Sequence, residues 1–122
     1  SRAELEAAGD AYFAYWADKT VSVPWGYPCS RLEGGMATNP DPNPSKTSTC
    51  SVGIPDQSFA PKANDYLVDV DHGMVVLFLN LPGPDSHWFR ITKSALMRYI
   101  HTLTICYVSG TWQCPGNAPT CS

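Results

Sequence analysis

Residues 66–81 read YLVDVDHGMVVLFLNL, and this stretch decides the fold. Its two apolar runs, 66–71 and 73–81, meet at the tight sequence Asp71-His72-Gly73, which is typical of a β-hairpin. From 74 to 81 the apolar residues occupy positions of both parities, so the second strand should be central and covered on both faces. An antiparallel sheet is therefore the expected centre of the molecule.

The hairpin is followed by further strand signals. Residues 82–85 form a turn sequence, 86–92 favour a strand, 93–94 make another connection, and a long strand is predicted from about 95 to 108. Together these segments predict an antiparallel meander. The tail, 109–122, is rich in turn residues and carries two cysteines.

The first twenty residues predict an amphipathic α-helix. Apolar side chains recur at helical spacing on one face, at Leu5, Ala8, Gly9, Tyr12, Phe13 and Trp16. Ser1 can cap the helix, which should end near Lys19 because Pro24 disfavours helix before it. The hydroxyls of Tyr12 and Tyr15 could reach a cavity, but a packed helix face is the more common meaning of this pattern.

The order of these segments predicts one α+β domain spanning 1–122. Between the helix and the meander lies a proline-rich loop, 36–65, with no apolar periodicity. A loop of this length is either functional or held covalently, and Cys50 lies within it. A helix across a bent sheet encloses a conical cavity, where small-molecule sites form.

The composition excludes several functions. The chain has 122 residues, of which 43% are hydrophobic and 16% are charged, so disorder is not expected. A net charge of −3 gives no basic surface for a nucleic acid. The longest apolar stretch, 74–79, is far shorter than the roughly 20 residues that cross a bilayer, so no membrane partner is expected.

Five cysteines indicate disulfides in an oxidising compartment. Their irregular spacing does not match a zinc site, and one must remain free or join another chain. We expect at least one of Cys29 and Cys50 to be bonded, with Cys29–Cys50 slightly favoured because the loop between them lacks a core of its own. Cys106 with a tail cysteine would form the second bridge. The start at Ser1, without Met or an apolar leader, fits a processed secreted chain or a trimmed sequence.

Strand parity selects the candidate catalytic residues. Tyr99 and His101 share one face of the last strand, and His87 lies on the strand before it. If His87 and His101 face the same side, both line one cavity with Tyr99 and can transfer protons near neutral pH. The alternative is structural, with His87 hydrogen-bonded to Asp85 or a loop carbonyl and His101 a cross-strand partner.

Two arginines are candidate electrostatic groups. Arg31 and Glu33 occupy an i, i+2 pair, so both side chains should lie on one face and bind each other or a ligand, an internal ion pair being favoured. Arg90 interrupts an apolar strand and would need a partner if buried, such as Glu33 or Asp71. No phosphate-binding glycine loop and no hydrolase motif occurs.

Four segments carry a resemblance to a known family. They are PCSRLEGG (28–35), CSVGIP (50–55), DSHWFR (85–90) and YIHTLTIC (99–106). These segments resemble small secreted fungal proteins and are similar to SnoaL-like members of the nuclear-transport-factor and ketosteroid-isomerase superfamily. The resemblance covers roughly residues 3–112.

The resemblance implies a cone-shaped half-barrel with the N-terminal helix over an internal pocket, often dimerising through the outer face of the sheet. SnoaL-like enzymes isomerise, cyclise, hydrate or rearrange hydrophobic small molecules without a cofactor. In such a site His101 or His87 would be the base, Tyr99 a hydrogen-bond donor, and Arg31 or Arg90 an electrostatic stabiliser. An apolar ligand would contact Tyr12, Phe13, Trp16, Phe89, Met97 and Leu103.

Three functions therefore compete. The chain is a cofactor-independent isomerase or cyclase acting on a natural product, a secreted ligand-binding or effector-like protein without turnover, or a partner-binding module acting through its proline-rich loop. A pocket reached by at least two titratable side chains would favour an enzyme, whereas a cavity lined only by apolar residues would favour binding.

Overall fold

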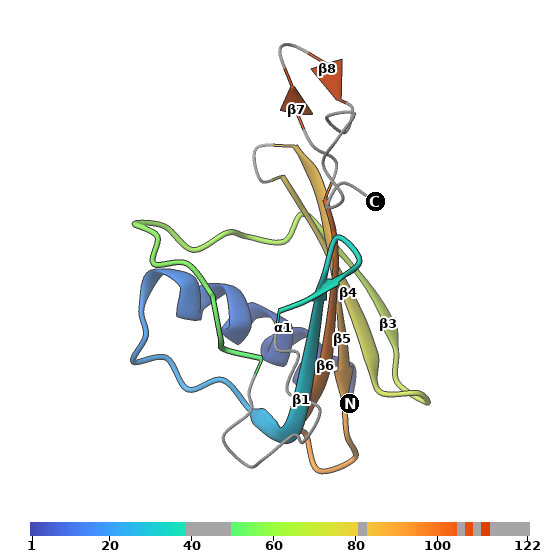
Figure 1. Cartoon of the computed structure of the whole chain (residues 1–122). Coiled ribbons are helices and arrows are strands. Elements are labelled where there is room, and N and C mark those ends of the chain that lie inside the picture. Colours follow the sequence, from blue (N-terminus) through green and yellow to red (C-terminus); the bar gives the residue numbers. More distant parts are fainter. Residues whose placement is uncertain (39–49, 81–82, 105–106, 109–110, 113–122) are drawn as a thin grey trace.

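The chain forms one helix and an open six-stranded sheet in the computed structural model, which describes residues 1–38, 50–80, 83–104, 107–108 and 111–112 (Figure 1). The predicted α+β class is confirmed. The elements are α1 (Arg2–Ala17), β1 (Trp25–Glu33), β2 (Met36–Ala37), β3 (Asp65–Asp69), β4 (Met74–Asn80), β5 (Pro84–Ile91), β6 (Met97–Thr104), β7 (Tyr107–Val108) and β8 (Thr111–Trp112).

Polar side chains stabilise both ends of helix α1. Ser1 and Glu4 form a capping box, in which the Ser1 hydroxyl accepts from the backbone N–H of Glu4 and the Glu4 carboxylate accepts from the Ser1 amino group. The helix ends at Ala17, two residues before the expected end. Lys19 instead donates from Nζ to the carbonyls of Tyr15, Trp16 and Pro55, so it holds the loop at Pro55 against the end of the helix.

The sheet is mixed, with the strand order β2-β1-β6-β5-β4-β3. Strands β3 to β6 form the predicted antiparallel meander, but β1 runs parallel to β6. The expectation of a wholly antiparallel sheet was therefore wrong. The physical reason is that β1 and β6 are far apart in the sequence, so no tight hairpin turn imposes an antiparallel direction on them. The expected strand 95–108 is also shorter, because β6 ends at Thr104 and 107–108 pair with 111–112.

Helix α1 lies against one face of the sheet (Figure 1), and the hydrophobic core is packed between the two. The helix contributes its predicted apolar face, and the strands contribute Val75, Leu77, Phe89, Met97 and Ile100, each completely shielded from solvent. Gly9 permits this close approach, since a Cβ there would lie 2.6 Å from the Leu77 Cδ1. Burial of each such aliphatic or aromatic side chain stabilises the fold by about 1.5–3 kcal/mol.

The outer face of the sheet is apolar and partly exposed. Val76 is buried, but Phe78 on the same face is 41% exposed and Trp88 on β5 is 39% exposed. The prediction that residues 74–81 are covered on both faces was therefore wrong for the outer face. The physical reason is that α1 covers the other face, and no second helix occurs in the part of the chain that the structure describes. Among the described residues, no helix is long and apolar enough to cross a membrane.

Candidate functional site

A cavity of about 400 Å³ opens at one end of the inner face of the sheet. Its walls come from the end of α1, the β1–β2 turn and the adjoining parts of β5 and β6. The volume falls within the range of small-molecule sites, about 300–1,000 Å³. The polar and aromatic side chains at its wall are Trp16, Glu33, Thr38, Asp85, His87, Thr102 and Thr104.

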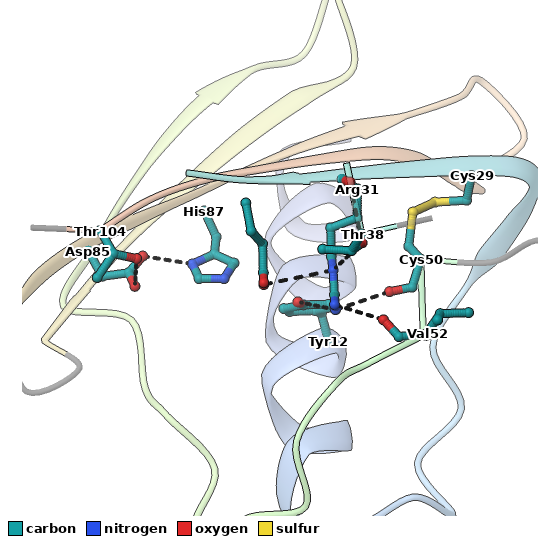
Figure 2. A network of polar contacts seen from close by, with 10 residues as sticks. Tyr12, Cys29, Arg31, Thr38, Cys50, Val52, Asp85, His87 and Thr104 are labelled. Atoms are coloured by element: carbon teal, nitrogen blue, oxygen red, sulfur yellow. Dashed lines mark hydrogen bonds and ion pairs between the residues drawn. A yellow bond between two sulfur atoms is a disulfide. The ribbon is translucent and has the colours of Figure 1, made fainter. Parts of the chain in front are cut away.

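His87 and Asp85 form a buried polar pair in this wall (Figure 2). The two residues are i, i+2 on β5 and share the inner face, as strand alternation requires. The His87 Nδ1 lies 2.9 Å from the Asp85 Oδ1, and the Asp85 Oδ2 accepts a hydrogen bond of 2.8 Å from the Thr104 hydroxyl. Because a carboxylate only accepts hydrogen bonds, this arrangement places the neutral imidazole's proton on Nδ1 and leaves a lone pair on Nε2.

Three buried polar atoms at the cavity wall have no hydrogen-bond partner among the described residues. They are the His87 Nε2, the Thr102 Oγ1 and the Trp16 Nε1, and their residues are 1%, 6% and 8% exposed. Because leaving a buried polar group unpaired costs about 1–3 kcal/mol, these atoms are positions where an additional hydrogen-bond partner would be favourable.

These side chains form a row across three neighbouring strands. Glu33 of β1 pairs in register with Thr102 of β6, which pairs in turn with His87 of β5. All three line the cavity. Three titratable side chains, Glu33, Asp85 and His87, therefore reach one cavity, which is the arrangement that the sequence analysis associated with an enzyme.

Arg31 occupies the interior beside this row and is 3% exposed (Figure 2). Its guanidinium donates to the Thr38 hydroxyl, the Tyr12 hydroxyl and the carbonyls of Cys50 and Val52. Its Nε also lies 3.7 Å from the Glu33 Oε1, so the favoured internal ion pair is confirmed. Arg31 thus joins α1, β1 and the segment after Cys50, and its donors are engaged by the protein itself.

The disulfide Cys29–Cys50 is confirmed and anchors the same region. It crosses a sequence separation of 21 residues and joins β1 to the segment whose carbonyls bind Arg31 (Figure 2). Cys29 and Cys50 are both buried. The predicted second bridge involves Cys106 and the tail cysteines, which lie outside the described residues.

The predicted ligand-binding residues occupy three environments. Trp16 is at the cavity wall, and Leu103 lies on the outer face with 36% exposure. Tyr12, Phe13, Phe89 and Met97 are at most 1% exposed and pack in the core instead. Burial raises the pKa of Tyr12 to about 12, so its phenol remains protonated while it accepts a hydrogen bond from Arg31.

His87 and His101 do not share a face, so the expectation of one site containing both with Tyr99 was wrong. The β5–β6 register sets His87 opposite Thr102, which places His101 opposite Trp88 on the outer face. Tyr99 lies on that outer face as well and is 38% exposed. The physical reason is that a shift of one residue in strand pairing exchanges the two faces, and parity within each strand does not determine the pairing.

Arg90 also lies outside the cavity. It is exposed on the outer face of β5, between Met74 and Tyr99 in register, so the condition under which it would need a buried partner is not met. Conversely, sequence reasoning did not identify Thr102 and Thr104 as wall residues, and it treated Asp85 only as a structural partner of His87. The i, i+2 spacing of Asp85 and His87 was the available signal for their pairing.

Comparisons with known proteins establish a family. No curated protein and no solved structure matches the chain significantly. Residues 1–104, which include α1, the complete six-stranded sheet and every residue of the cavity wall, match a family model described as a domain of unknown function, DUF8021. The chain belongs to the DUF8021 family.

Proposed function

We propose that the protein is a cofactor-independent isomerase- or cyclase-type enzyme that acts on a hydrophobic small molecule by acid–base catalysis at His87. One observation carries the proposal: the buried His87 is held by Asp85 through Nδ1, while its Nε2, at the wall of a cavity, has no partner in the part of the chain that the structure describes. A base whose orientation is fixed by a carboxylate and whose second nitrogen is free is the arrangement that proton transfer requires.

The proposed step begins with the lone pair of Nε2. A substrate C–H or O–H within hydrogen-bond reach of Nε2 gives up its proton, and the electron pair moves onto the substrate's conjugated oxygen. The Asp85 carboxylate stabilises the imidazolium that forms, while the Thr102 hydroxyl and the Trp16 indole N–H are available as donors to the developing oxyanion. Imidazolium then returns the proton at a different position, which completes an isomerisation without a cofactor.

The structural setting supports two further parts of the proposal. One helix on one face of an open, strongly twisted sheet is compatible with a SnoaL-like cone-shaped half-barrel (Figure 1). The Cys29–Cys50 disulfide supports secretion or a secretory-pathway lumen, because structural disulfides persist in oxidising compartments.

The test is proton transfer to carbon in D₂O. Wild-type protein and the variant His87→Gln are incubated with a pooled library of uncharged hydroxy and carbonyl compounds, and products are analysed by mass spectrometry. The proposal expects compounds that gain deuterium or change retention time only with wild type. His101→Gln, the same substitution on the outer face, is the matched control and should behave as wild type. Equal labelling with His87→Gln would contradict the proposal.

The second candidate is a ligand-binding or effector-like protein without turnover. The observation that favours it is the close packing of the His87 ring, whose centroid lies 4.8 Å from that of Phe13 and 6.1 Å from that of Phe89. Cavity binding with no isotope incorporation would support this candidate. A partner-binding role for the loop 36–65 involves residues 39–49, which lie outside the described residues.

A homodimer through the outer face of the sheet is proposed with either function. Its support is the row of partly exposed apolar side chains on β3 to β6, at Leu67, Phe78, Trp88, Tyr99 and Leu103. Sedimentation at several concentrations tests it, and the variant Trp88→Lys should shift the protein to monomer. A wild-type chain that stays monomeric at every concentration would contradict it.

A further inference from the structure

We propose that the cavity is selective for a ligand that is uncharged or cationic and donates hydrogen bonds, and that Glu33, two strands from His87 on the same face of the sheet, sets this preference. The inference rests on the proposed function, because it concerns the same cavity. It adds the class of ligand and a specificity-determining residue.

The wall of the cavity has more hydrogen-bond acceptors than free donors. With the His87 proton directed at Asp85, the unpartnered nitrogen of the imidazole is an acceptor, and the carboxylates of Glu33 and Asp85 are acceptors too. The Thr104 hydroxyl already donates to Asp85, and the Thr38 hydroxyl donates to the Arg31 carbonyl. Among the described side chains of the wall, Thr102 and Trp16 are the remaining donors. A ligand that supplies hydroxyl or amine donors therefore satisfies more of this wall than one that supplies only acceptors.

The charges at the cavity wall disfavour an anionic ligand. Among the described residues no lysine or arginine lines the cavity, whereas two carboxylates do. Arg31 is the nearest cation to Glu33, but it is buried and donates to four protein oxygens, so it balances Glu33 without being available to a ligand. A carboxylate or phosphate ligand would meet Glu33 and Asp85 with no free cation to neutralise it.

The spacing of the row suits a ligand with two donors. Glu33 and His87 are two strands apart with Thr102 between them, so their Cα atoms are separated by roughly two interstrand spacings, about 10 Å. Both residues line the cavity, one on each side of Thr102. A hydroxyl placed over Thr102 can therefore bond to one of them while a second donor of the same ligand bonds to the other.

The test uses three probes of the same size and different charge: benzyl alcohol, benzylammonium and benzoate. Binding is followed by NMR through the ¹⁵N resonances of the His87 imidazole and the Trp16 indole. Wild-type protein should bind the alcohol and the amine at least about tenfold more tightly than benzoate, which corresponds to about 1.4 kcal/mol. Glu33→Gln should reduce this discrimination, whereas Glu6→Gln removes the same charge from α1, outside the cavity wall, and should leave it unchanged.

The outcomes separate the two proposals. Benzoate that binds wild type as tightly as benzyl alcohol, with shifts at His87, would overturn this inference and leave the proposed function standing. If Glu33→Gln and wild type discriminate equally between the probes, Glu33 does not determine the ligand preference. If no probe shifts His87 or Trp16, both the inference and the proposed function fail. The wild-type comparison is decisive even if Glu33→Gln folds poorly.

Discussion

Removal of the Cys29–Cys50 disulfide should destabilise the protein by about 3 kcal/mol or more. The bridge closes a loop with a sequence separation of 21 residues. In the chain-entropy model, closing a loop of that length restricts the unfolded chain by about 3 kcal/mol at 25 °C. The variant Cys29→Ala/Cys50→Ala also loses two buried sulfur atoms, so the measured loss should exceed the entropic value.

Urea unfolding followed by tryptophan fluorescence measures this loss. The double variant should also show a steeper dependence of the unfolding free energy on urea, because its unfolded chain is less compact and exposes more surface. Its native state should keep the Arg31 contacts only in part, since the carbonyls of Cys50 and Val52 are then held by the guanidinium alone. A loss below about 1 kcal/mol with an unchanged urea slope would refute the reasoning.

Three further predictions concern stability. Burial raises the pKa of Tyr12 to about 12, above its ordinary value of 10.0, so Tyr12 ionises in the unfolded chain at a lower pH than in the folded protein. The free energy of unfolding should therefore fall by up to about 1.4 kcal/mol per pH unit between those values. Urea melts at alkaline pH should show that Tyr12→Phe removes this part of the pH dependence. Trp16→Ala should cost about 3–5 kcal/mol in the same assay, since Trp16 is 8% exposed, and a cost below about 1 kcal/mol would contradict its place in the core. Gly73→Ala should cost more than about 2 kcal/mol, because Gly73 has φ +65° and a Cβ would overlap the Ile91 carbonyl oxygen; a neutral effect on the melting temperature would contradict the turn geometry.

The helix and the meander could be predicted because their signals are local. The period of the apolar face and the cap at Ser1 specify α1, and the Asp71-His72-Gly73 turn specifies the β3–β4 hairpin. Strand β1 carries weaker signals. Gly26 and Pro28 interrupt its pattern. Its parallel pairing with β6 joins two segments that are distant in the sequence, and no short sequence specifies it.

The sequence could predict only the part of the candidate site that is formed by residues on the same strand. Alternation places Asp85 and His87 on one face, and the structure brings them together. The approach of Glu33 to Thr102 and His87 depends on the register of three strands, which a shift of one residue would destroy. The same dependence explains why His101 and Tyr99 lie on the outer face although their spacing was compatible with a shared cavity.

The protonation state of the His87 imidazole tests the central claim most directly. Long-range ¹H–¹⁵N NMR of the free protein near neutral pH distinguishes the two neutral tautomers, and Asp85→Asn is the matched variant because it keeps the shape but not the charge of the partner. We predict that Nδ1 carries the proton and that Nε2 is unprotonated. The ¹⁵N resonance of Nε2 should shift when benzyl alcohol is added, and both features should be altered in Asp85→Asn. A neutral His87 that carries its proton on Nε2, or an Nε2 that no cavity ligand shifts, would contradict it.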